Sequence, residues 1–200
     1  MDCHWLDAFS LPSGAAWIIA GGIAGHDLHA AIRLEEVRTT IRAIALETDS
    51  PARALEHADR ALQLSKDSGP IQIACAAAVA PYDELRISSA GHPPPMFLTP
   101  GQPPTPVELG HSEPPLGVLP GPRRTSITIP FPPGSVILAY TSGVIEGPRS
   151  FSGTNIADVC ATVRDAPPDQ LSNTVLDAIR QQRQGDFHIG ITAMRRRAPV

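Results

Sequence analysis

The chain has 200 residues, of which 42% are hydrophobic and 18% charged, a composition typical of a soluble globular protein with one domain and a substantial core. Its formal net charge of −4 gives no basis for binding nucleic acid or a membrane surface. No apolar run reaches the roughly 18 residues of a membrane-spanning helix, and the start M-D-C-H-W-L-D lacks the features of a signal peptide. Since Cys3, Cys75 and Cys160 form no C-x-x-C pair, we expect a cytoplasmic protein with reduced thiols.

The first half of the sequence predicts a hairpin, two helices and a second hairpin. Apolar runs at 5–9 and 15–20 flank the turn at 12–14, and a glycine-rich corner at 21–26 leads toward the first helix. Ser50 and Pro51 mark the start of the second helix, because serine is a good N-cap and proline suits the first turn. The helices are expected at 28–46 and 51–64, and the second pair of strands at 71–79 and 84–89.

The second half predicts more strands, a long loop and two further helices. A proline- and glycine-rich loop spans 100–121, and the run Val136–Tyr140 has the length of a strand buried on both faces. We treat the chain as one domain, residues 1–200, with Arg195–Val200 as a solvated tail. Because strands and helices are grouped, antiparallel sheets with helices outside are favoured. The other elements are expected as strands at 96–99, 126–129 and 185–194 and as helices at 155–164 and 167–183.

A series of short motifs carries a family resemblance. They read D-C-H-W-L-D-A-F at 2–9, I-A-G-G-I-A-G-H-D at 19–27, A-G-H-P-P at 90–94, P-L-G at 115–117, T-S-G-V at 141–144 and F-H-I-G at 187–190. In this order they resemble the SpoIIE-type (PPM-family) metal-dependent protein serine/threonine phosphatases. The resemblance covers nearly the whole chain and implies an α+β fold, an α/β/β/α sandwich of two antiparallel sheets flanked by helices. The strand that usually precedes the first motif is expected to be absent, which would leave an edge for a homodimer.

The resemblance also identifies the positions of the family's metal ligands. In the family four aspartates hold two Mn²⁺ or Mg²⁺ ions that activate water against a phosphoserine or phosphothreonine. Those positions are occupied here by His4, Gly22, Ser142 and Phe187. Hard divalent cations need oxygen ligands, chiefly carboxylates. We therefore assign no catalytic residue and expect no metal cofactor.

Two alternatives keep a metal. In the first, a site rebuilt from His4, Asp7, Asp186 and His188 takes Zn²⁺. Asp7 corresponds to a supporting residue of the family, and Asp186 lies one residue before an expected ligand position. In the second, the protein is an active Mn²⁺- or Mg²⁺-dependent phosphatase with an atypical site.

The remaining motif residues are expected to shape the backbone. His92 should turn the chain between strands, and His26 should bond a backbone group at a helix start. The resemblance gives structural roles to Gly25, His26, Gly91, His92, Gly117 and Gly143.

The predicted function follows from an intact scaffold without its metal ligands. We expect a pseudophosphatase that acts by protein binding in a bacterial partner-switching pathway of sigma-factor regulation. The resemblance implies as partner a STAS-type anti-anti-sigma factor, an anti-sigma kinase or a related phosphatase, and no nucleic acid or membrane. The competing hypothesis is a working protein serine/threonine phosphatase.

Overall fold

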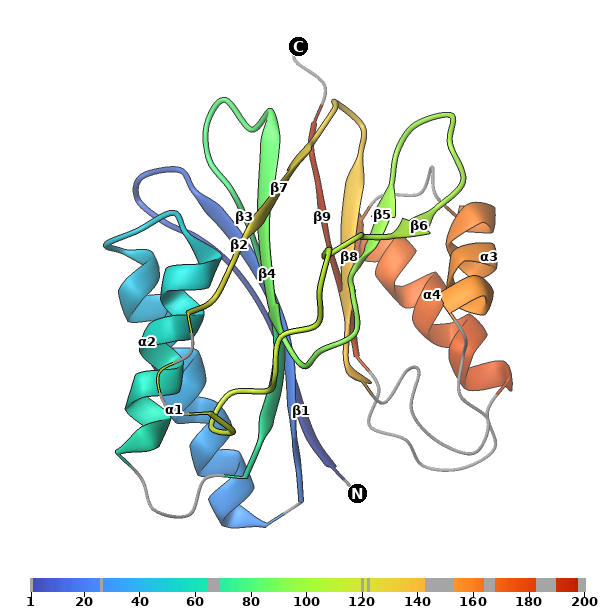
Figure 1. The fold of residues 1–200 in the computed structure, drawn as a ribbon. Helices are drawn as coiled ribbons and strands as arrows, with labels where there is room; N and C mark the ends of the chain where they lie inside the picture. Colours follow the sequence, from blue (N-terminus) through green and yellow to red (C-terminus); the bar gives the residue numbers. More distant parts are fainter. Residues whose placement is uncertain are drawn as a thin grey trace.

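The protein folds as two antiparallel sheets stacked face to face, with a pair of helices on each outer face (Figure 1). The computed structural model describes residues 2–25, 27–64, 69–119, 121, 123–142, 153–163, 168–182 and 190–197. One sheet has the strand order β1-β2-β3-β4-β7, and the other has the order β6-β5-β8-β9. The elements are β1 (Asp2–Ser10), β2 (Ala16–Ala24), α1 (Leu28–Ala45), α2 (Pro51–Gln63), β3 (Ile71–Ala78), β4 (Glu84–Ala90), β5 (Met96–Leu98), β6 (Thr105–Pro106), β7 (Ile127–Pro130), β8 (Val136–Tyr140), α3 (Gly153–Val163), α4 (Pro168–Gln182) and β9 (Ile191–Arg195).

The layered arrangement confirms the predicted α/β/β/α sandwich. Helices α1 and α2 cover the β1-β2-β3-β4-β7 sheet, while α3 and α4 cover the other sheet (Figure 1). Strand β1 forms an edge of its sheet, and the described residues include no strand beside its outer side. None of the helices in the described part of the chain is both long and apolar enough to cross a membrane.

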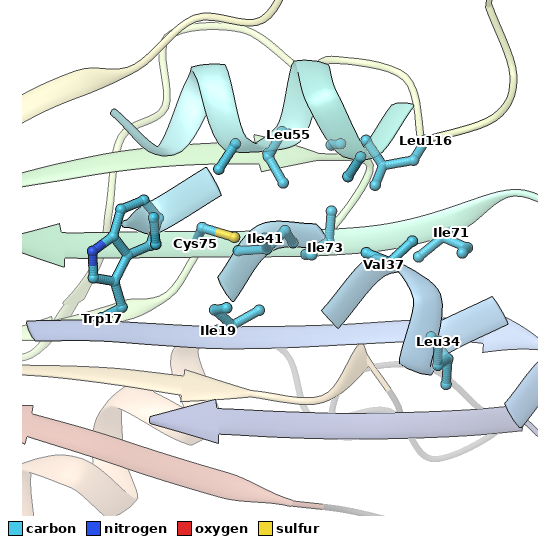
Figure 2. Close-up of a cluster of buried hydrophobic side chains, with 14 of the residues drawn as sticks. Trp17, Ile19, Leu34, Val37, Ile41, Leu55, Ile71, Ile73, Cys75 and Leu116 are labelled. Atoms are coloured by element: carbon cyan, nitrogen blue, oxygen red, sulfur yellow. The ribbon is translucent and has the colours of Figure 1, made fainter. Parts of the chain in front are cut away.

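The buried side chains form three layers, which explains why several strands are apolar throughout. Along β2, Trp17 and Ile19 face the helices, whereas Ile18 faces the other sheet. Figure 2 shows Ile41 of α1 and Leu55 of α2 in the cluster with Ile19 and with residues of β3. A strand with a buried layer on each side has no position at which a polar side chain is favoured.

Helix ends follow the capping residues. Asp27 caps α1 by accepting a hydrogen bond from the Ala30 N–H at 2.8 Å, and Ser50 caps α2 by accepting from the Arg53 N–H. Both side chains satisfy donors that have no partner inside the helix. The predicted helices at 28–46 and 51–64 are therefore confirmed to within a residue at each end.

Two predicted boundaries are wrong. The corner expected at 21–26 is a continuation of β2 as far as Ala24, since Gly21 and Gly22 pair with β1 on one side and β3 on the other. The start of the tail was predicted too early, at Arg195. This residue belongs to β9 and pairs with Val136 of β8. Arg196 then donates through Nη1 to the Phe131 carbonyl at 2.6 Å, so its guanidinium is held against the β7–β8 turn.

A buried ion pair fixes the long loop at 100–121 to α2. Asp59 and Arg124 are 1% and 0% exposed in their side chains and bond to one another. Arg124 also donates to the Pro114 carbonyl, and the Gly117 N–H donates to Asp59 Oδ1 at 2.9 Å. A carboxylate and a guanidinium that are each paired and hydrogen-bonded can be buried together. The loop's P-L-G segment is consequently anchored at a defined place on the helix.

Candidate functional site

Two of the positions predicted to correspond to the family's metal ligands lie directly opposite one another. His4 of β1 and Gly22 of β2 are register partners in the antiparallel pair. A Cβ atom placed on Gly22 would lie 2.5 Å from His4 Nδ1 and 3.1 Å from His4 Cε1. Since real Cβ contacts are essentially never this short, the imidazole occupies the space that a side chain at residue 22 would need.

The neighbouring register pair, Trp5 and Gly21, has the same arrangement on the other face of the sheet. Trp5 is the register partner of Gly21, and a Cβ atom on Gly21 would overlap the indole ring. Aromatic rings that cover strand glycines restore the packing that the missing side chain would supply. The two glycines therefore mark two aromatic contacts across the strands. The glycine pair was visible in the sequence, but a glycine pair in a strand and a glycine-rich corner look alike there.

Ser142 lies at the same end of the sandwich. It directly follows Thr141 at the end of β8 and is 2% exposed. Thr141 and Gly190 exchange two hydrogen bonds of 3.1 Å, from the Thr141 N–H to the Gly190 carbonyl and from the Gly190 N–H to Thr141 Oγ1. The Leu6 side chain packs against Gly190, where a Cβ atom would lie 2.7 Å from Leu6 Cδ1. Because the residues at 141, 142 and 190 are small, the backbone at Gly190 can contact both Thr141 and the Leu6 side chain.

Asp7 lies on the face of β1 opposite to His4. Successive side chains of a strand alternate between faces, and Asp7 accepts hydrogen bonds from Arg42 Nε at 2.6 Å and Arg38 Nε at 3.1 Å, both on α1. Burial alone would raise the pKa of Asp7, but the bonds from Arg42 and Arg38 outweigh it and hold that pKa below its usual range. The Asp7 carboxylate is engaged between the sheet and α1, whereas His4 belongs to the face toward the other sheet.

His92 is a buried titratable group of this region. Its Nδ1 lies 2.8 Å from the Pro93 carbonyl, and its ring centroid lies 6.4 Å from that of Tyr140. Its Nε2 has no hydrogen-bond partner among the described residues. Burial, with a smaller contribution from the charge of His4, lowers the pKa of His92 to about 4. The ring is therefore neutral at physiological pH.

The A-G-H-P-P and P-L-G motifs pack against each other. Gly91 has φ of +68°, and a Cβ atom on it would lie 2.5 Å from Pro115 Cγ. Only glycine combines this left-handed backbone with such close contact. The Gly91 N–H also donates to the Glu113 carbonyl at 2.8 Å. These contacts join the two motifs through Gly91, whereas the role predicted for His92 in turning the chain stays a prediction.

The described residues do not fit a pair of hard divalent cations. Gly22 offers no donor atom, its side-chain space is filled, and the Ser142 hydroxyl is neutral. Within the described ranges, no group of three or more His, Cys, Asp or Glu side chains is arranged to hold a metal ion. The other predicted site residues, Asp186, Phe187 and His188, lie outside the described residues, as do His26 and Gly143.

Comparison with solved structures finds the same fold in bacterial phosphatase domains. The crystal structure of the RsbU and RsbW domains of Rv1364c from Mycobacterium tuberculosis is 28% identical, with a TM-score of 0.87, and the match covers 100% of this chain and 56% of that one. The PP2C phosphatase domain of SpoIIE from Bacillus subtilis, solved with a fragment of its regulatory domain, is 14% identical over 96% of this chain and 56% of that one, with a TM-score of 0.76. This chain thus spans just over half the length of both.

A third solved structure contains metal. The catalytic domain of the serine/threonine protein phosphatase PstP, in complex with two manganese ions, is 11% identical with a TM-score of 0.62, and the match covers 96% of each chain. At this identity the likeness concerns the fold alone. The family model for stage II sporulation protein E (SpoIIE) matches residues 12–192, which is most of the chain. Together with the sandwich and the ordered motifs, that match shows that the chain belongs to the SpoIIE family of PP2C-like phosphatase domains.

Proposed function

We propose that this protein is a SpoIIE-family pseudophosphatase, a domain that keeps the phosphatase fold in the cytoplasm and acts by binding a protein partner. The observation that carries the proposal is the His4–Gly22 pair, in which the imidazole fills the space of a family metal ligand. A vacant position could admit water and a loosely held ion, but a packed one cannot.

The chemistry of phosphoester hydrolysis explains why this change matters. Two divalent ions lower the pKa of a bound water and neutralise charge on the phosphoryl group. Carboxylates both bind such ions and offset their charge. His4, Gly22 and Ser142 supply no carboxylate, and the nearest acidic residue of β1, Asp7, is bonded to Arg38 and Arg42. The chain's own groups therefore support binding better than hydrolysis.

The expected partner is a component of a partner-switching pathway. In the M. tuberculosis relative an RsbU domain and an RsbW domain occur in one structure. We infer for this chain a STAS-type anti-anti-sigma factor, an anti-sigma kinase or a related phosphatase as partner. Recognition would use surfaces of the folded domain and would need no metal.

Metal titration tests the proposal without a choice of substrate. Chelator-treated protein is titrated calorimetrically with Mn²⁺ and, separately, with Zn²⁺, and the matched variant carries His4→Asp, Gly22→Asp, Ser142→Asp and Phe187→Asp together. We expect no saturable binding of either ion by the natural chain up to millimolar metal and a gain of Mn²⁺ binding in the variant.

An enzymatic assay supplies the opposing outcome. The natural chain is incubated with a phosphoserine-containing STAS protein in Mn²⁺, with and without EDTA. Phosphate release that EDTA abolishes, together with saturable metal binding, would establish the competing hypothesis of an active phosphatase with an atypical site. Asp7→Asn and His188→Ala would then identify whether those residues support the activity.

A further inference from the structure

A cavity lies at the end of the sandwich opposite to His4 and Gly22. Its volume is about 550 Å³, and its walls come from the β1–β2 turn, the β3–β4 turn and the end of β9. Ser10 at the far end of β1 lines it and lies six positions along the strand from His4, or about 20 Å at the usual rise. Figure 1 shows β9 ending at this end of the sandwich and β1 beginning at the other.

One side of this cavity is rich in arginine. The lining includes Arg195, Arg196 and Arg197 and no acidic residue. The adjacent Asp83 accepts a hydrogen bond from Arg196 Nη2 at 2.6 Å and so neutralises the charge of Arg196. Arg197 is exposed, and its guanidinium gives this side of the cavity an excess of positive charge.

The other side is apolar and held in place. Phe131 is 1% exposed and makes a tilted ring contact with Phe97, with centroids 6.2 Å apart. Tyr82, in a left-handed conformation with φ of 64°, donates its hydroxyl to the Gly14 carbonyl at 2.7 Å and so links the two turns. Met194 continues this apolar surface. A wall anchored in the inter-sheet core does not need to be ordered when a ligand binds.

We propose that this cavity is a binding site for a small aromatic anion, a role separate from the pseudophosphatase function. The ring would pack against the partly exposed side chains of Tyr82 and Met194, since aromatic and thioether groups favour flat apolar ligands. The anionic group, a phosphate, sulfonate or carboxylate, would be bound by the arginine side, because guanidinium groups bond such oxyanions in a fork geometry. The volume lies within the range of small-molecule sites, roughly 300–1,000 Å³.

The test uses a matched pair of fluorescent probes. 1-Anilinonaphthalene-8-sulfonate carries both the ring and the anion, whereas N-phenyl-1-naphthylamine carries the ring without charge. Both are titrated into the natural chain and into Arg197→Glu, with Arg60→Glu as the control that changes charge equally at an exposed position of α2. Ser10→Phe fills the cavity from an exposed strand end.

We expect Arg197→Glu to lower the affinity for the anionic probe about tenfold, as for loss of one charge-assisted contact, and to leave the affinity for the neutral probe unchanged. Ser10→Phe should lower the affinity for both probes, and Arg60→Glu should change neither affinity. The proposal is overturned if the anionic probe does not bind saturably, if Ser10→Phe leaves its affinity unchanged, or if Arg60→Glu weakens it as much as Arg197→Glu. Displacement of the probe by inorganic phosphate at equal concentration would also overturn it, since the ring would then contribute nothing. Near-UV circular dichroism verifies that each variant is folded.

Discussion

The packing of His4 against Gly22 predicts that adding a single methyl group at Gly22 destabilises the protein. In Gly22→Ala the new Cβ would lie 2.5 Å from His4 Nδ1, so the ring must move by about 1 Å to reach an ordinary contact. Overpacking of this kind costs about 1–3 kcal/mol. Replacing a strand glycine by alanine otherwise stabilises by roughly 0.5–1 kcal/mol. Because His4 is only half-buried and can yield, we expect a net loss of about 1–2 kcal/mol in the free energy of unfolding.

The assay is a double-mutant cycle by urea unfolding. His4→Ala removes the ring, so Gly22→Ala should stabilise the protein by roughly 0.5–1 kcal/mol in that background. The coupling between the two positions then equals the overpacking cost, about 1–3 kcal/mol. Gly69→Ala is the matched control, because a Cβ there would meet nothing closer than Ile23 Cδ1 at 3.8 Å. If Gly22→Ala is as stable as the natural chain, or if the two changes are simply additive, the imidazole does not fill the position.

Three further predictions concern buried charge. The pKa of His92 is lowered to about 4 in the folded state, against about 6.5 in the unfolded state. The free energy of unfolding should therefore be highest above pH 6.5 and fall by up to about 3 kcal/mol as the pH drops toward 4. Urea unfolding at several pH values should show a smaller drop for His92→Gln. Asp59→Ala should cost about 3–5 kcal/mol, because it removes the carboxylate bonded to the buried Arg124 guanidinium and leaves only Glu113, at 3.6 Å, as its counter-charge. The double variant Asp59→Leu/Arg124→Met should recover much of that loss, and equal losses in both would contradict the buried pair. Asp7→Asn should lower the midpoint of thermal unfolding through loss of its bonds to Arg38 and Arg42, and a stability unchanged in low salt would refute those bonds.

Elements with a local signal could be predicted from the sequence. The run 136–140 is a strand because five consecutive apolar residues fit a position buried on both faces. The helix at 51–63 follows from Ser50 and Pro51, whose roles depend only on neighbouring backbone groups. The sandwich itself followed from the order of motifs, which preserve the turns and close contacts of the fold.

Features that depend on partners distant in the sequence could not be predicted. Gly21 and Gly22 resemble a corner until Trp5 and His4 are placed opposite them, and that register is set by the whole hairpin. Asp7 looked available for a metal because nothing near it in the sequence shows its bonds to α1. Arg196 likewise belongs to the fold only because its partners, Asp83 and Phe131, come from turns far earlier in the chain.

The His4–Gly22 pair also bears on how the metal site could be restored. An aspartate introduced at Gly22 alone would meet the imidazole, while an aspartate introduced at His4 alone would leave Gly22 without a donor. Neither single change yields two facing carboxylates, and the first should reduce stability before it contributes any ligand. Restoring metal binding therefore requires both positions to change together, with Ser142→Asp and Phe187→Asp supplying the rest of the donor set. It follows that the four-residue variant should bind Mn²⁺ more strongly than the sum of its single substitutions predicts, and an additive series would mean that the positions act independently.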